Sequence, residues 1–268
     1  MKKAHWAGVF FLAALSFLPA IASAVQYEPS VGQEGKDVIW VPTPEELVQS
    51  MLDLAKVAPG DFVMDLGSGD GRIVIAAAKR GAQAVGIEYN PDMVELSRRN
   101  AAKAGVSDRA TFVNADLFAT DLSRATVVTM YLLPQLNLKL RPAILDLKPG
   151  TRVVSHAFNM GEWSADQIVE KGGRTAYLWI VPAKVEGTWI WQASSGSAEL
   201  KLTQNFQNIS GTLKVSGKSF TLENAKLEGG LLRFNAGDEQ YAGRVNGKSI
   251  EGTVRTGGSE RKWSASKS

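Results

Sequence analysis

A glycine-rich turn at residues 65–72 carries the residue types best suited to chemistry in this chain. The segment is Asp-Leu-Gly-Ser-Gly-Asp-Gly-Arg, and it follows a short apolar run and precedes a helical pattern. Glycines in such a turn let the backbone approach a ligand closely and adopt conformations that other residues avoid. Glu88 ends the next apolar run, where a carboxylate can accept hydrogen bonds from both hydroxyls of a ribose. The pattern predicts a site for a ribose-containing ligand.

Two classes of cofactor fit this layout. A dinucleotide site has Gly-x-Gly-x-x-Gly and places a pyrophosphate at the helix N-terminus. Here the third glycine, Gly71, comes one residue early, and Arg72 occupies the expected position. Asp65 and Asp70 add two carboxylates, which would repel a pyrophosphate and suit a cation without phosphate. S-adenosylmethionine carries a sulfonium and an ammonium, so we expect it as the cofactor.

At these residues the chain resembles the class I S-adenosylmethionine-dependent methyltransferases. The segment Asp65-x-Gly67-x-Gly69 is similar to their motif I, and Glu88 corresponds to their ribose-binding acid. Residues 114–117, Asn-Ala-Asp-Leu, are similar to the loop in which an acid faces the adenine amine. By this resemblance the cofactor-binding residues are Asp65, Gly67, Ser68, Gly69, Asp70, Glu88, Asn114 and Asp116. Asp70 could equally cap the following helix, and Arg72 could pair with a carboxylate rather than contact a ligand.

A closer resemblance is to the small protein-lysine methyltransferases related to those acting on the ATP synthase c-subunit and to an archaeal lysine methyltransferase. Residues 65–77 are very similar to theirs, and Trp40-Val41-Pro42-Thr43 is similar to their Tyr-Val-Pro-Thr/Ser segment, with Trp40 in place of the usual tyrosine. The likeness covers roughly residues 38–182. It implies methyl transfer to a lysine amine of a protein, with Trp40, Pro42 and Thr43 at the edge of the substrate and cofactor site.

The acceptor side is expected at the ends of two further apolar runs. Tyr131 ends the fourth run, where methyl donor and acceptor meet in this fold, and His156 ends the fifth. The Asn/Asp-Pro-Pro-Tyr box of enzymes that methylate planar amino or amide groups is absent, which argues against methylation of nucleic-acid amino groups and suits an aliphatic amine or another acceptor. Tyr131 is a candidate substrate contact or a packed aromatic, and His156 a candidate base or a structural residue. In-line alignment can suffice for methyl transfer, so no dedicated base is required.

The elements that position these residues alternate along residues 25–182. Apolar runs predict strands at 61–66, 84–88, 111–113, 126–131 and 151–155. Helical patterns lie between them, at 73–80, 91–104 and 136–147. Residues 168–170 and 175–181, separated by Gly172-Gly173, predict a closing hairpin. This alternation predicts an α/β fold with a mostly parallel, Rossmann-like methyltransferase sheet and helices on both faces.

The pattern changes over residues 185–268, where the helical periodicity stops. About eight short alternating runs follow, with Asn, Gly and Ser between them, and they predict a small antiparallel barrel or sandwich. Gly187-Thr188-Trp189 is faintly similar to the Gly-x-Trp opening of lipocalin-like barrels. Three roles stay open for this domain: ligand binding, docking of a partner, or bracing of the first domain.

Residues 1–24 predict a signal peptide. Lys2 and Lys3 precede an apolar stretch, and Ala22-Ser23-Ala24 is a small-residue cleavage site. We expect cleavage after Ala24 and export to the periplasm or the outside. The alternative is an uncleaved membrane anchor, since the segment from Ala4 to Ala24 carries no Asp, Glu, Lys or Arg. Either outcome places the body of the protein on the far side of the membrane.

Composition narrows the remaining possibilities. The 268 residues contain no Cys, which excludes disulfides, a thiol nucleophile and iron–sulfur clusters, and only two His, which argues against a His-rich metal centre. Loss of Lys2 and Lys3 would lower the formal net charge of +3 by two, so charge does not indicate a nucleic-acid partner. A protein substrate is expected. Because S-adenosylmethionine is made in the cytoplasm, a non-catalytic envelope protein that keeps the fold is an alternative, as is a small-molecule methyltransferase.

Overall fold

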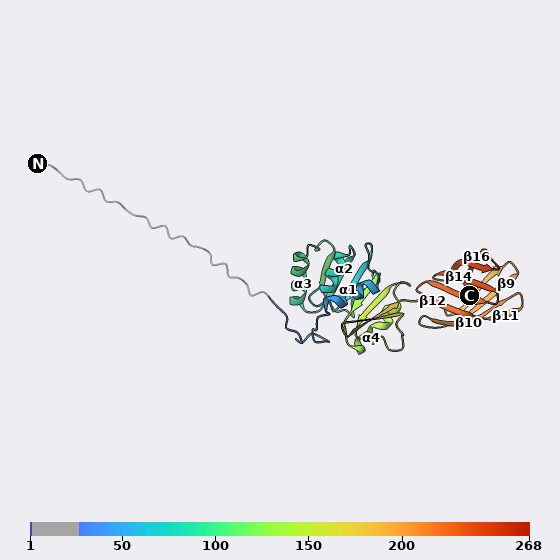
Figure 1. Cartoon of the computed structure of the whole chain (residues 1–268), viewed down its shortest axis with the longest axis horizontal. Coiled ribbons are helices and arrows are strands. Elements are labelled where there is room, and N and C mark those ends of the chain that lie inside the picture. The colour runs from blue at the N-terminus through green and yellow to red at the C-terminus, as the bar shows by residue number, and fades with distance from the viewer. Residues whose placement is uncertain (2–26) are drawn as a thin grey trace.

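The computed structural model describes Met1 and residues 27–268, which form two sheets that follow one another along the chain (Figure 1). The predicted signal peptide, its cleavage after Ala24 and the alternative anchor lie outside the described residues. Among the described residues, no helix is both long and apolar enough to cross a membrane.

The first sheet has seven strands in the order β3-β2-β1-β4-β5-β7-β6. These strands are β1 (Phe62–Leu66), β2 (Gln83–Glu88), β3 (Ala110–Asn114), β4 (Val127–Met130), β5 (Arg152–His156), β6 (Gln167–Lys171) and β7 (Arg174–Ile180). Strands β1 to β5 pair in parallel, while β7 runs antiparallel to both β5 and β6. The predicted α/β sheet and its closing hairpin are confirmed. The strand order reverses between β1 and β4, the point at which open parallel sheets bind ligands.

Four helices belong to this sheet. They are α1 (Glu45–Leu54), α2 (Arg72–Lys79), α3 (Pro91–Lys103) and α4 (Pro134–Leu145). Helix α3 begins as its sequence indicates, because Asn90 Oδ1 accepts the backbone N–H of Asp92 at 2.9 Å and Pro91 fills the first turn. Helix α4 begins two residues before its predicted start, since Pro134 also suits a first helical position.

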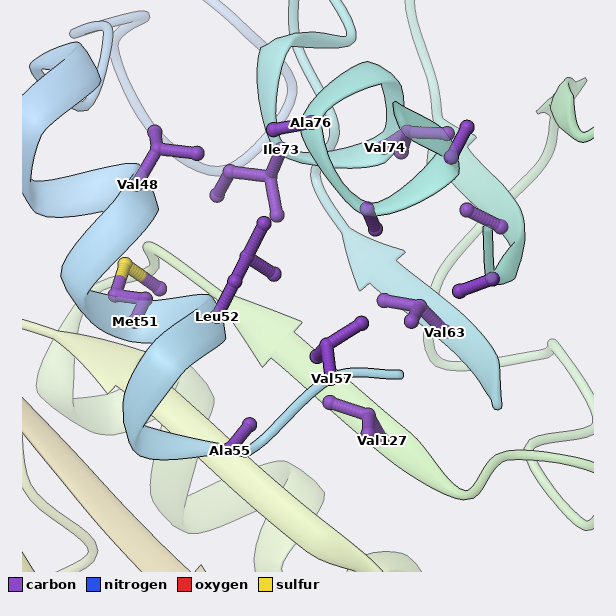
Figure 2. Packing of buried hydrophobic residues seen from close by; sticks show 14 of the residues in the cluster. Val48, Met51, Leu52, Ala55, Val57, Val63, Ile73, Val74, Ala76 and Val127 are labelled. Atoms are coloured by element: carbon purple, nitrogen blue, oxygen red, sulfur yellow. The ribbon is translucent and has the colours of Figure 1, made fainter. Parts of the chain in front are cut away.

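Helix α1 was not predicted, although its sequence carries a clear signal. Leu47, Val48, Met51 and Leu52 are fully buried, and their spacing places them on one helical face after Pro44. Figure 2 shows Val48 and Leu52 beside Ile73 of α2. This packing fixes the end of the segment 33–43, which leads into α1 and reaches the site described below.

The second sheet has nine antiparallel strands in the order β11-β10-β9-β8-β16-β15-β14-β13-β12. They are β8 (Gly187–Ala193), β9 (Gly196–Asn205), β10 (Asn208–Val215), β11 (Lys218–Thr221), β12 (Glu223–Glu228), β13 (Leu231–Ala236), β14 (Glu239–Asn246), β15 (Ser249–Thr256) and β16 (Ser259–Lys267). The end strand β12 lies beside β10, so the sheet curls into a nearly closed barrel. Of the two predicted forms, barrel and sandwich, the structure confirms the barrel.

Two details of the barrel go beyond the sequence pattern. Residues 220–227, whose apolar alternation predicts a single strand, are divided at Leu222 between β11 and β12, which accounts for nine strands instead of about eight. Aromatic side chains fill the interior: Phe234 stacks on Tyr241 at 4.7 Å between ring centroids, and Trp263 meets Tyr241 edge-on at 5.3 Å. Side chains therefore occupy the space in which a lipocalin-like barrel holds its ligand.

Candidate cofactor and acceptor site

A cavity of about 730 Å³ opens where β1, β2 and β4 end, at the reversal of strand order. The segment 33–43, which we call the strap, forms one wall, and the glycine-rich turn lies opposite. The predicted residues that line the cavity are Trp40, Pro42, Thr43, Asp65, Gly67, Ser68, Gly69, Asp70, Glu88, Asp116 and Tyr131. Asn114 and His156 are not part of its lining.

The glycine-rich turn presents backbone closely to the cavity. Gly67 and Gly69 have φ of +75° and +55°, which favour glycine. A Cβ atom on Gly69 would lie 2.7 Å from Nε1 of Trp40, so the strap packs directly on the turn. The Ser68 hydroxyl is buried against Gly86 of β2 and has no hydrogen-bond partner among the described residues.

Glu88 joins the turn to the start of α3. One carboxylate oxygen accepts the backbone N–H of Gly69 at 2.9 Å, and the other accepts that of Asn90 at 2.9 Å. Both oxygens keep lone pairs for further donors. The carboxylate is thus held rigidly at the cavity wall, where the ribose contact remains a prediction.

Asp65 lies at the base of the turn and is almost completely buried. Burial raises its pKa to about 7, while a hydrogen bond donated by Thr129 Oγ1 at 2.7 Å acts in the opposite direction. The neighbouring acids Glu88 and Asp70 add to the increase. A bound cation would favour the charged form of this buried carboxyl group and so lower its pKa from about 7.

This pKa predicts that cofactor affinity depends on pH. In the free protein Asp65 is half protonated near pH 7, and a bound sulfonium or ammonium would lower its pKa, so binding releases a proton. The affinity for S-adenosylmethionine should therefore reach its maximum at pH values above about 7. At lower pH it should decrease by up to about tenfold per pH unit. Calorimetric titrations of S-adenosylmethionine between about pH 6 and pH 8 test this, in buffers of different ionisation enthalpy. Asp65→Asn should bind S-adenosylmethionine more weakly and show no dependence of affinity on pH. If the affinity of the unaltered protein did not change with pH, Asp65 would not be the residue that binds the cofactor's cation.

Asp70 and Arg72 form a pair that ties the turn to the strap. Arg72 Nε and one terminal nitrogen donate to the two Asp70 oxygens at 2.9 and 2.6 Å, and its other terminal nitrogen donates to Thr43 O at 2.8 Å. Of the two alternatives for Arg72, the structure shows the carboxylate pair. Asp70 still borders the cavity, with its charge directed to Arg72.

At the predicted adenine end of the cavity, Lys36 of the strap contacts Asp116, the acid predicted to face the adenine amine. Lys36 Nζ donates to Asp116 Oδ2 at 2.7 Å and lies 4.5 Å from the centroid of the Tyr89 ring. The hydrogen bond from Lys36 holds the pKa of Asp116 below its ordinary value. Asn114 instead donates to the backbone oxygens of Glu88 and Tyr89, at 3.1 and 2.6 Å, and so braces the strand end. Lys36 and Tyr89 were not predicted, because nothing local in the sequence marks either as a site residue.

At the predicted acceptor end, aromatic side chains form a layered wall. Tyr131 lines the cavity and stacks on His156 with ring centroids 3.7 Å apart, and Phe158 stands 6.2 Å from Tyr131. His156 lies behind this wall, and its Nδ1 is 3.0 Å from Thr43 Oγ1. Burial, with a smaller contribution from Arg174, lowers the pKa of His156 to about 4, so its ring is neutral near pH 7. A base role for His156 stays a prediction, while Phe158 is a wall residue that the sequence did not indicate.

These features fit S-adenosylmethionine. A half-ionised buried acid suits a cation, an anchored glutamate suits a ribose, and positive-φ glycines suit close approach of a ligand to the backbone. The cavity volume also lies within the range of small-molecule sites.

The segment that forms this site is similar in sequence to known proteins. Residues 65–167 match the family of the ANTKMT methyltransferase domain. A solved structure described as an RNA methyltransferase from Salinibacter ruber, in complex with S-adenosyl-L-homocysteine, is 53% identical, with a TM-score of 0.53, and the match covers 54% of this chain and 96% of that one. The fold and the site are those of an S-adenosylmethionine-dependent methyltransferase.

Two curated relatives define the family further. The protein-lysine N-methyltransferase of Saccharolobus islandicus is 46% identical over 151 residues, covering 54% of this chain and 94% of that protein. The lysine N-methyltransferase of the ATP synthase c-subunit from Mus musculus is 33% identical over 180 residues, covering 61% of this chain and 72% of that protein. The chain belongs to the family of these protein-lysine N-methyltransferases. The barrel lies outside the residues that match the family domain.

Proposed function

We propose that this chain transfers a methyl group from S-adenosylmethionine to the side-chain amine of a lysine in a protein substrate. The observation that carries this proposal is the 46% identity to a protein-lysine N-methyltransferase over nearly all of that protein's length. The apolar and aromatic wall of the cavity supports it, because such a wall suits the aliphatic stem of a lysine.

In this proposal, the residues that line the cavity bind the cofactor or orient the lysine. S-adenosylmethionine supplies an electrophilic methyl group on its sulfonium. Asp65 and Glu88 hold the cofactor, and Tyr131 with Phe158 orients the lysine stem so that its neutral amine lies in line with the methyl group. The His156 ring supports Tyr131 from behind.

Labelled methyl transfer tests the acceptor class. The protein is incubated with S-adenosylmethionine carrying a tritiated methyl group and, separately, with envelope proteins or total RNA. We expect label in methyl-lysine after acid hydrolysis of the protein fraction, and none with Glu88→Ala. Label in RNA nucleosides would overturn the lysine proposal in favour of the activity for which the Salinibacter ruber protein is named.

Turnover is also expected to depend on the ring of Tyr131. Tyr131→Ala removes the ring that stacks on His156 and faces Phe158, so methyl transfer should fall by about tenfold or more, since misplaced acceptors react slowly. Tyr131→Phe keeps the ring and should retain most activity. Initial rates at saturating S-adenosylmethionine, together with calorimetric affinities, separate orientation from cofactor binding. Unchanged turnover in Tyr131→Ala would place the acceptor elsewhere.

We also propose that the mature protein is exported and begins at Val25. The support is the charged start, apolar stretch and Ala22-Ser23-Ala24 site in the sequence. Intact mass of the protein recovered from the periplasm tests this directly. Retention of residues 1–24 would favour the membrane-anchored alternative, and recovery in the cytoplasm would overturn export.

A further inference from the structure

The β9–β10 turn of the barrel contacts helix α4 and the loop between β5 and β6. Phe206 in this turn stacks on Trp163 with ring centroids 6.0 Å apart and planes inclined by 16°. The Arg141 guanidinium of α4 lies 5.6 Å from the same ring. Beside it, Gln207 Nε2 donates to the backbone oxygen of Ser164 at 2.7 Å. The turn therefore holds two residues of the loop between β5 and β6.

That loop, residues 157–166, starts in a strained conformation. Ala157 has φ of +64°, and the N–H of Phe158 donates to His156 O at 2.8 Å across it. This is a γ-turn with positive φ, the rare and strained form. Such backbone persists only where the surroundings over-determine it. The strain lies between His156 and Phe158, the two residues that flank Tyr131 at the acceptor wall.

The supports of this loop form a connected set. Asn137 Nδ2 donates to Phe158 O at 3.1 Å, and Arg141 donates to Met160 O at 2.9 Å, both from α4. Trp179 Nε1 donates to Trp163 O at 2.7 Å from β7. Trp163 is fully buried, and Phe206 covers it while also facing Arg141. Removing Phe206 would uncover Trp163 and take away the ring that Arg141 faces.

We propose that Phe206 is a positioning residue, through which the barrel holds the loop 157–166 and so keeps Phe158 at the acceptor wall. This rests on the proposed function, because that function takes the Tyr131–Phe158 wall as the acceptor end. The barrel then acts on methyl transfer without contacting the cofactor. Cofactor affinity should consequently be insensitive to Phe206, whereas the Phe158 environment and turnover should respond.

The test places 4-fluorophenylalanine at position 158 of the full-length protein and records its fluorine resonance with and without S-adenosylhomocysteine. We expect Phe206→Ala to shift or broaden the resonance and Phe206→Tyr, which keeps the ring, to restore it. Phe220→Ala is the matched control, because Phe220 is a half-buried aromatic on β11 of the same barrel. Strand β11 lies at the end of the barrel away from the first sheet (Figure 1). It should leave the resonance unchanged.

Kinetics provide the second readout, with poly-L-lysine as the acceptor probe. Phe206→Ala should lower turnover by about tenfold and leave the Kd for S-adenosylhomocysteine within about twofold of the unaltered protein, a change too small for a lost cofactor contact. A Phe158 resonance identical in Phe206→Ala and the unaltered protein would overturn the inference. Failure of the unaltered protein to bind S-adenosylhomocysteine would instead contradict the proposed function, and the resonance comparison would still decide the role of Phe206.

Discussion

Glu88→Ala is expected to weaken binding of S-adenosylmethionine by about ten- to a hundredfold, the range for losing a hydrogen bond to a charged group. The predicted ribose hydroxyls would lose their carboxylate acceptor, and the N–H groups of Gly69 and Asn90 would lose theirs at the same time. The mutation therefore removes a predicted cofactor contact and the anchor that fixes the turn. Calorimetric titration measures the change, and circular dichroism checks that the variant is folded.

Glu88→Gln serves as the matched control for this result. Glutamine has nearly the same size and keeps one acceptor oxygen, but its amide donors would face one of the two backbone N–H groups. We expect its affinity to lie between that of the unaltered protein and that of Glu88→Ala. If both variants bind as tightly as the unaltered protein, Glu88 does not hold the cofactor.

Gly71→Ala is expected to destabilise the first sheet by about 2–4 kcal/mol, from backbone strain and overpacking together. Gly71 has φ of +82°, and a Cβ there would lie 2.7 Å from Cε1 of Phe112 and 2.9 Å from Cβ of Ser97. Ser97 in turn donates to Gly69 O at 2.8 Å, so a shift of Ser97 would also disturb the cofactor turn. Denaturant unfolding measures the loss of stability, and calorimetry the accompanying loss of affinity.

Gly105→Ala separates the contribution of backbone strain to the loss of stability from that of overpacking. Gly105 has a similar φ of +70°, but a Cβ there would meet nothing within 4 Å, so the substitution adds strain without a clash. We expect it to cost about 1–2 kcal/mol and to leave cofactor affinity unchanged. Equal losses of stability in the two variants would show that the close approach of an added Cβ at position 71 to Phe112 and Ser97 costs nothing.

The sequence predicts the parts of this protein that depend on local patterns. Strand β1, the turn after it and the acid that ends β2 follow from apolar runs and glycine spacing, which set backbone conformation over a few residues. The start of α3 is equally local, because Asn90 and Pro91 determine it. Helix α1 was missed despite its one-sided apolar face, since its ten residues carry no motif that indicates chemistry.

Side-chain direction and distant contacts could not be predicted in the same way. Lys36 meets Asp116 across 80 positions, and nothing near either residue marks the pair. Asn114 and Asp116 lie close together in the sequence, yet Asn114 braces the backbone while Asp116 faces the cavity. His156 lies behind Tyr131 because of how β4, β5 and the strap pack together. The contact of Phe206 with Trp163 likewise joins two domains that the sequence pattern treats separately.

Calorimetric titration of S-adenosylmethionine and of S-adenosylhomocysteine into the folded protein tests the central claim most directly. We predict one site per chain with a Kd in the micromolar range for both, and weaker binding in Glu88→Ala. Absence of binding in a protein shown to be folded would contradict the assignment of the cavity to this cofactor, and with it the methyl transfer proposed here.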